Sequence, residues 1–253
     1  MLSLQEQLLD AAELLHDARR IVVLTGAGIS TESGIPDFRS PGSIWLQHPP
    51  VSYSEFLHNP QARQRYWQTR QSLAQQVASA QPNAAHRALV ELERRQVLLA
   101  VITQNFDGLH QDAGLAPERV IELHGTSRLA ACTRCGTRSS MAALQERINA
   151  GEIDPCCPVC GGFLKSATIL FGQRIPEAEL RRARELSATC DLFLVVGSSL
   201  KVIPASTLPR LALHRTVALI IVNIQPTPYD ASADVVIHEK AGTILPTLVA
   251  MLV

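Results

Sequence analysis

Continuous apolar runs and helically spaced apolar positions alternate along the chain. Four apolar runs, each followed by polar residues or glycine, predict buried strands at residues 21–25, 98–103, 191–197 and 217–223. Helical spacing follows at residues 85–95, 176–188 and 204–214, and the N-terminal segment 1–17 also has one apolar helical face. Strands that alternate with helices form a parallel sheet covered on both faces, so the pattern predicts an α/β fold with a doubly wound sheet.

Two segments interrupt this alternation. Residues 40–81 are rich in Pro, Gln, Ser and aromatic residues, with helical character at 60–77, and residues 130–164 hold five of the six cysteines. We expect both to form a smaller lobe beside the sheet. The chain is then one domain, residues 1–253, with a large lobe formed by 1–40, 85–129 and 165–253, a helical insertion at 41–84 and a metal-binding module at 130–164.

Charge and hydropathy exclude several classes of protein. Lys and Arg total 23, as do Asp and Glu, so there is no basic excess of the kind that binds nucleic acid. Residues 1–17 contain no Lys or Arg, unlike a signal or transit peptide, and the longest apolar runs are too short to cross a bilayer. We therefore expect a cytoplasmic protein with no nucleic-acid or membrane partner, and six cysteines in such a protein favour metal binding over disulfides.

The cysteines follow a zinc-ligand spacing. Cys132 and Cys135 form one Cys-x-x-Cys-Gly segment, and Cys157 and Cys160 form another, with 21 residues between the two segments. Four thiolates complete a closed tetrahedral site, which predicts one structural zinc ion. Cys156 is an alternative to Cys157, but only Cys157 has the two-residue spacing to Cys160.

A glycine turn follows the first predicted strand, at Gly26-Ala27-Gly28. Glycines there let backbone N–H groups approach a pyrophosphate. The dinucleotide fingerprint of dehydrogenases is incomplete, because the third glycine and the later acidic residue are missing. The Gly-Ile-Pro segment at residues 34–36 cannot continue a long helix, so we expect a loop that folds over a nucleotide.

Polar residues gather at the ends of the other predicted strands, where ligands of parallel sheets bind. Gln104, Asn105 and Asp107 follow the second strand. His124 follows a further short apolar segment and is a candidate general base. The remaining candidates are hydroxyl groups and open backbone for phosphate or ribose, and one amide for adenosine: Gly197, Ser198, Ser199 and Asn223.

Taken in order, these segments resemble the sirtuins over nearly the whole chain. The resemblance rests on residues 26–39, Thr103-Gln104-Asn105-Phe106-Asp107-Gly108-Leu109-His110, His124-Gly125, the paired cysteines, Phe171-Gly172, residues 197–202 and Asn223. It implies a Rossmann-like large lobe and an enzyme that removes acetyl or other acyl groups from protein lysines. NAD would be the co-substrate, and the products would be nicotinamide, 2′-O-acyl-ADP-ribose and free lysine.

The resemblance also implies roles for single residues. The acyl oxygen would attack the ribose carbon as nicotinamide leaves, and His124 would then deprotonate a ribose hydroxyl. Gln104, Asn105 and Asp107 would shape the nicotinamide pocket and orient the ribose hydroxyls. Zinc would do no chemistry. The acylated peptide would lie between the lobes as an added strand, flanked by Phe171, Gly172, Gln173 and Val202. The implied NAD-binding residues are Gly26, Ala27, Gly28, Thr31, Ile35, Asp37, Phe38, Arg39, Gln104, Asn105, Asp107, Gly197, Ser198, Ser199, Asn223 and Ala241.

Some positions depart from the family pattern. Lys165-Ser166 replaces a basic-Pro pair, and Gln173 replaces a glutamate. Family members that prefer succinyl groups have Tyr-x-x-Arg, whereas here Tyr66 is followed three places later by Thr69, so we expect acetyl and apolar acyl groups to be preferred. The alternatives are protein ADP-ribosylation or NAD hydrolysis in the same pocket, or a zinc-ribbon binding module that NAD only regulates.

Overall fold

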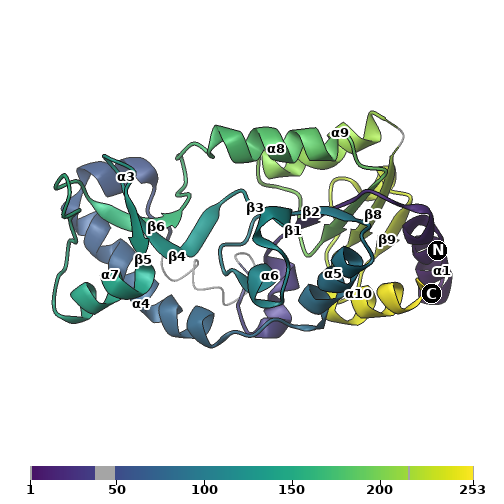
Figure 1. Cartoon of the computed structure of the whole chain (residues 1–253), viewed down its shortest axis with the longest axis horizontal. Coiled ribbons are helices and arrows are strands. Elements are labelled where there is room, and N and C mark those ends of the chain that lie inside the picture. The colour runs from purple at the N-terminus through teal and green to yellow at the C-terminus, as the bar shows by residue number, and fades with distance from the viewer. Residues whose placement is uncertain (1, 38–48, 216, 253) are drawn as a thin grey trace.

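The computed structural model describes residues 2–37, 49–215 and 217–252. Two lobes lie side by side along the long axis, with both chain termini on the large lobe, at the right of Figure 1. Among the described residues, no helix combines the length and the apolar character that crossing a membrane would require.

The large lobe is built on a six-stranded sheet of parallel strands in the order β3-β2-β1-β7-β8-β9. The four predicted apolar runs are confirmed as strands, and two strands of three residues each extend the sheet at its edges. The bounds are β1 Ile21–Thr25, β2 Leu98–Thr103, β3 Val120–Glu122, β7 Leu192–Val196, β8 Ala218–Val222 and β9 Val235–Ile237.

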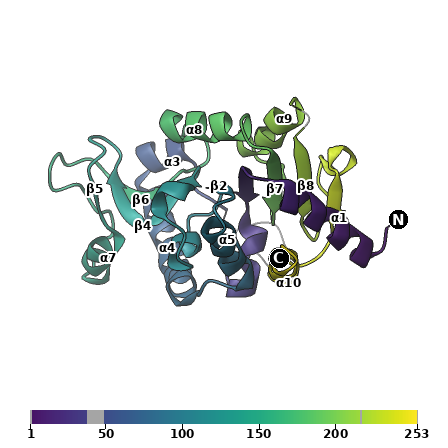
Figure 2. The ribbon, with the colours of Figure 1, turned by 45° about the vertical axis from the view of Figure 1, so that its right-hand side comes forward.

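Helices cover both faces of this sheet, as Figures 1 and 2 show. On one face, Val23 of β1 packs into a core with α1 (Leu4–Asp17), α5 (Ala84–Arg94) and α10 (Ala241–Ala250). On the other face, Val22 and Leu24 pack with α8 (Glu177–Ser187) and α9 (Leu208–Leu213). The predicted α/β doubly wound sheet is therefore confirmed. The other helical segments that the structure describes in this lobe are short: α6 Leu109–Asp112, η1 Ala27–Ile29, η2 Thr31–Ser33, η3 Pro117–Arg119, η4 Ala205–Thr207 and η5 Asp230–Ser232.

The small lobe combines a three-stranded antiparallel sheet with helices. Its strands are β4 (Gly125–Cys132), β5 (Arg138–Ser140) and β6 (Leu164–Thr168), in the order β5-β4-β6. These strands begin and end a few residues outside the range 130–164. Its helices are α3 (Tyr53–His58), α4 (Pro60–Ser79) and α7 (Met141–Asn149), and α4 confirms the helical character predicted at 60–77. The Arg63 guanidinium on α4 donates to Asp154, at 2.8 Å from Oδ2. This ion pair links the helical insertion to the cysteine-containing module.

The carboxyl ends of β1 and β7 approach each other closely. The N–H of Gly26 donates to Val196 O at 3.1 Å, and the N–H of Gly28 donates to Gly197 O at 2.9 Å. Gly197 has a φ of +60°, and a Cβ added there would lie 2.3 Å from the Ile29 nitrogen. Glycine is required at this crossing, because any side chain would push the two strand ends apart. The strand order reverses at this point, and such reversals form the ligand crevice of doubly wound sheets.

Candidate functional site

The glycine turn leads directly into this crevice. After β1 the chain makes two short 3-10 turns, and the Thr31 hydroxyl donates to Gly28 O at 3.0 Å. Within the described residues up to Asp37 no long helix follows, in agreement with the prediction that the Gly-Ile-Pro segment cannot continue one. Ile35 and Asp37 are half-buried at the end of this segment. The predicted NAD contacts Phe38 and Arg39 lie outside the described residues.

Asn105 and Asp107 meet this turn through one serine hydroxyl. The Asn105 amide donates from Nδ2 to Gly26 O at 3.2 Å and to Ser30 Oγ at 3.1 Å. Ser30 Oγ in turn donates to Asp107 Oδ2 at 2.8 Å. The ends of β1 and β2 are therefore joined by a continuous hydrogen-bonded group of side chains, and the amide and the carboxylate predicted as a pair are brought together.

The Asp107 carboxyl is buried, with 8% of the residue exposed. Burial raises its pKa above the ordinary aspartate value, while hydrogen bonds from Leu109 N and the Ser30 hydroxyl oppose that shift. A carboxylate that keeps its charge in such a place costs folding free energy. Costly buried groups of this kind concentrate at functional sites.

Gln104 connects two further predicted positions, Ser198 and His124. Its side-chain Nε2 donates to Ser198 Oγ at 2.8 Å, across the sheet from β2 to the turn after β7. Its backbone carbonyl accepts a hydrogen bond from Nδ1 of His124 at 2.9 Å. Burial lowers the pKa of His124, and the bond to Gln104 O opposes that shift. His124 therefore favours the neutral form, in which Nε2 is the basic nitrogen.

The candidates on the far side of the crevice lie along β8 and α10. Asn223 follows β8, where its N–H donates to Ile237 O at 3.1 Å and its side chain donates to Gln225 O. Ala241 begins α10, and the next N–H, that of Gly242, donates to the Glu32 carboxylate at 2.7 Å. This bond joins α10 to the 3-10 turns that follow the glycine turn. Ser199 lies half-buried after β7, next to Ser198.

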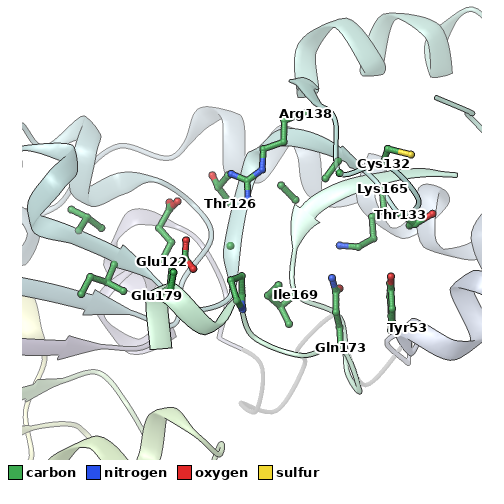
Figure 3. A pocket seen from close by; sticks show the side chains of 18 of the residues that line it. Tyr53, Glu122, Thr126, Cys132, Thr133, Arg138, Lys165, Ile169, Gln173 and Glu179 are labelled. Carbon is green, nitrogen blue, oxygen red and sulfur yellow. The ribbon is translucent and has the colours of Figure 1, made fainter. Parts of the chain in front are cut away.

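A cavity of about 620 Å³ lies between the lobes (Figure 3). Its lining includes Gln173, Tyr53 and Ile169, whereas His124 and Asn105 are not among its lining residues. Ile169 nevertheless reaches the catalytic candidates, since its N–H donates to His124 O at 2.8 Å. The cavity therefore lies next to the polar residues at the strand ends, including His124 and Asn105, and does not contain them.

The residues expected to flank a peptide come from two linkers. Phe171 is 65% exposed, and its carbonyl accepts the Tyr53 N–H at 2.8 Å, which ties the β6–α8 linker to the small lobe. Gly172, at φ +79°, follows in this linker before Gln173. Val202 lies half-buried in the other linker, after β7.

The paired cysteines converge in the small lobe. The Sγ atoms of Cys132, Cys135, Cys157 and Cys160 all lie within 4.8 Å of one another. The pair Cys132–Cys160 is 3.5 Å apart and the pair Cys135–Cys157 is 3.8 Å apart. A tetrahedron with Zn–S bonds of about 2.3 Å has S···S edges of about 3.8 Å, so these four thiols fit a structural zinc ion. They leave no ligand position for water, so the zinc would hold the lobe together without taking part in chemistry.

The glycine turn, the polar strand ends and the four-cysteine module can now be compared with known proteins. Residues 26–204 match the model of the Sir2 family, which is more than half of the chain.

The chain belongs to the Sir2 family.

Curated sirtuins are similar over almost their whole length. "NAD-dependent protein deacetylase 2" of Streptomyces coelicolor is 48% identical over 232 residues, covering 90% of this chain and 95% of the relative. "NAD-dependent protein deacylase 2" of Archaeoglobus fulgidus is 42% identical over 250 residues, covering 97% and 96%. Among solved structures, a Sir2 protein with a deacetylated p53 peptide and 3′-O-acetyl-ADP-ribose is 33% identical, covers 98% of each chain and has a TM-score of 0.87.

Two contributors to this sirtuin site had no role in the sequence-based prediction. Ser30 and His110 stand within the motifs, but their side chains were not singled out. Ser30 bridges Asn105 and Asp107, and His110 contacts Thr25 at 2.9 Å. A polar residue next to the glycine turn was the available signal for Ser30. For His110 the signal was a histidine placed seven residues after the end of a buried strand.

Proposed function

We propose that this sirtuin removes acetyl and other acyl groups from protein lysines, with NAD as co-substrate. The products would be nicotinamide, 2′-O-acyl-ADP-ribose and free lysine. The observation that carries the proposal is the convergence of Asn105, Asp107 and His124 beside the glycine turn at the strand reversal. The deacetylase and deacylase names of the relatives support it, as do the peptides and acetyl-ADP-ribose held by related structures.

In this proposal the large lobe holds NAD. The glycine turn, with Gly26, Ala27, Gly28 and Thr31, supplies backbone for the phosphates. Asn223 and Ala241, with Gly197, Ser198 and Ser199, take the adenosine part and its ribose. Ile35, Asp37, Phe38 and Arg39 cover the nicotinamide half, together with Gln104.

Three side chains then serve the chemistry. Asn105 and Asp107 hold the nicotinamide and its ribose while the glycosidic bond breaks and the acyl oxygen takes its place. His124 would accept the proton of a ribose hydroxyl at Nε2, which would allow that oxygen to attack the acyl carbon. A water molecule would then add to this carbon as the lysine amine leaves, which gives free lysine and the ester of 2′-O-acyl-ADP-ribose. The bond from Nδ1 to Gln104 O supports this role, because it fixes the tautomer in which Nε2 is the acceptor.

The acylated lysine peptide would lie between the lobes as an added strand. Gly172 and Gln173 on one linker and Val202 on the other would flank its backbone, with Phe171 at the rim. Backbone pairing of this kind sets few demands on the peptide sequence. The four-cysteine zinc module would keep the small lobe in place beside that strand.

The decisive experiment measures nicotinamide release from NAD with and without an acetylated lysine peptide, and the mass of the peptide or protein afterwards. We expect nicotinamide release to require the acylated peptide. The mass of the peptide should fall by about 42 Da for each acetyl group removed. Gain of ADP-ribose on a protein would instead indicate ADP-ribosylation, and release without any peptide would indicate NAD hydrolysis. A cytoplasmic location, expected from the sequence, remains part of the proposal and is checked by cell fractionation.

A further inference from the structure

A second polar cluster lies inside the large lobe, directly beneath the proposed site. It consists of Thr25, Thr103, His86 and His110, which are all at most 2% exposed. None of them has a part in the proposed chemistry. Buried polar groups of this kind are costly unless their hydrogen bonds serve the structure or the site.

The cluster forms a chain of hydrogen bonds that converges on the Thr103 hydroxyl, which also accepts the backbone N–H of Asn105. Thr25 Oγ1 donates to Thr103 Oγ1 at 2.9 Å, and Thr103 Oγ1 also accepts the backbone N–H of Asn105 at 3.0 Å. The Thr25 hydroxyl has one proton and has given it to Thr103. Its 2.9 Å contact with Nε2 of His110 is therefore a bond in which His110 donates.

His110 is also coupled to the segment that carries Asp107. It lies on α6, which starts after Gly108, and Asp107 Oδ1 accepts the N–H of Leu109 at 3.0 Å. The segment 103–110 is therefore held at its beginning through Thr103 and at its end through His110. Both side chains proposed for the nicotinamide pocket, Asn105 and Asp107, lie between these two points.

The ring of His86 packs against the ring of His110. The two rings lie 5.0 Å apart between centroids at an angle of 56°. The Nδ1 atom of His86 contacts Asn83, whose side chain donates to Ile29 O at 2.7 Å and to Ser33 Oγ at 3.0 Å. The ring that packs on His110 is thus anchored to the turns that follow the glycine turn.

Burial keeps both imidazoles neutral. It lowers the pKa of His110 to about 3 and that of His86 to about 4. The Nε2 proton of His110 is then a permanent donor across the working pH range, since no second proton competes for the ring. Within the part of the chain that the structure describes, Nδ1 of His110 and Nε2 of His86 have no hydrogen-bond partner. The bond to Thr25 is therefore the hydrogen bond that the His110 ring makes there.

We propose that His110 is a positioning residue that holds Asn105 in place through Thr25 and Thr103. This rests on the proposed function of Asn105 in breaking the nicotinamide bond. Without the donor at Nε2, the Thr25 hydroxyl turns away from Thr103, and the Asn105 backbone loses its fixed acceptor. Misplacement of a reacting group by about 1 Å costs roughly 100-fold in rate, so a loss of this order or somewhat less is expected.

The test compares substitutions that keep or remove the donor at one position. His110→Gln places an amide N–H near the original Nε2, whereas His110→Asn places its amide near Nδ1 and cannot reach Thr25. Thr103→Val removes the acceptor hydroxyl with little change of shape. We expect kcat for deacylation to fall by about 10- to 100-fold in His110→Asn and Thr103→Val, with the KM for acetylated peptide changed by less than about threefold. His110→Gln should recover most of the activity.

Nicotinamide exchange gives the readout that a merely structural role would not move. Exchange of labelled nicotinamide into NAD should fall together with deacylation in His110→Asn and Thr103→Val, because Asn105 serves the earlier step. Equal activity of the Gln and Asn variants, or a lower Tm with kcat unchanged, would overturn the positioning role. Should these variants not fold, ¹⁵N NMR of the wild-type imidazoles decides, since an Nδ1–H tautomer of His110 rules out the donor bond. Failure of the proposed function is distinct, because the wild-type protein would then release no nicotinamide with acetylated peptide.

Discussion

His124 donates its Nδ1 proton to the backbone carbonyl of Gln104, at 2.9 Å. The side chain of the same glutamine donates to Ser198 at 2.8 Å. One residue therefore sets the tautomer of the proposed base and also ties β2 to the turn after β7. The base is oriented by backbone that belongs to the crevice itself.

Removal of the imidazole should separate two steps that the intact enzyme couples. We expect His124→Ala to bind NAD with similar affinity, because the glycine turn and Asn223 are unchanged. Deacylation should fall by roughly 10²- to 10⁴-fold, the usual contribution of a positioned general base. Exchange of labelled nicotinamide should survive better than product formation, because the earlier step does not need the base. A stable variant that deacylates at nearly the wild-type rate would exclude His124 from the mechanism.

The pH dependence of the reaction follows from the burial of His124. A base must be neutral to act, and burial lowers the pKa of this imidazole below its ordinary value of 6.5. The acidic limb of the kcat/KM profile should therefore lie below pH 6.5, and the rate should be independent of pH between that limb and neutrality. A profile whose acidic limb lies above pH 6.5 would contradict the assignment. The measurement uses saturating NAD and an acetylated peptide without titrating residues.

Replacement of Asp107 by asparagine should lower activity without lowering stability. Its pKa is raised in the folded protein, so its carboxyl binds a proton more readily there than in the unfolded chain. Charged Asp107 therefore opposes folding at neutral pH, and this penalty is relieved as the pH falls through the raised pKa. Asp107→Asn is expected to keep or raise Tm at pH 7 while nicotinamide exchange and deacylation fall together. A clear loss of Tm in Asp107→Asn would show that the charge stabilises the fold.

The sequence predicted those parts of the fold that have a local signal. β1, β2, β7 and β8 are buried on both faces, so each appears as a continuous apolar run. β3 and β9 have three residues each and pair with β2 and β8 at the edges of the sheet. A local pattern this short, such as the apolar segment before His124, does not by itself identify a strand. The same distinction applies to the site. Residues at the strand ends were predicted, because their position depends on one strand at a time.

Contacts between strands could not be predicted in this way. The bond from Thr25 to Thr103 depends on the register of β1 against β2, which places these two residues side by side. The role of Ser30 likewise depends on how the glycine turn approaches β2. Register is set by packing over the whole sheet, so it becomes visible only in the structure.

We expect acyl preference to depend on two side chains of α4 that already form hydrogen bonds in the small lobe. The Tyr66 hydroxyl accepts the Ser166 N–H at 3.0 Å, and the Thr69 hydroxyl donates to Arg65 O at 3.0 Å. A carboxylate entering here would have to displace these bonds, and an unpaired buried charge is costly. We therefore expect acetyl peptide to be deacylated with a higher kcat/KM than succinyl peptide of the same sequence. A higher kcat/KM for the succinyl peptide would make Arg70 the residue to test next, through Arg70→Gln.

The last prediction concerns the two adjacent cysteines of the small lobe. Cys157 Sγ lies 3.8 Å from Cys135 Sγ within the four-thiol group, whereas Cys156 lies outside that group with its thiol 3.6 Å from Asp154 O. The purified protein should contain one zinc ion per chain. Cys157→Ala should lose it and destabilise the small lobe, since the free energy of metal binding contributes to folding. Cys156→Ala is the matched control, with one neighbouring thiol removed and the ligand set intact, so it should keep full zinc and a nearly unchanged Tm. Metal analysis that finds full zinc in Cys157→Ala and none in Cys156→Ala would reverse the ligand assignment.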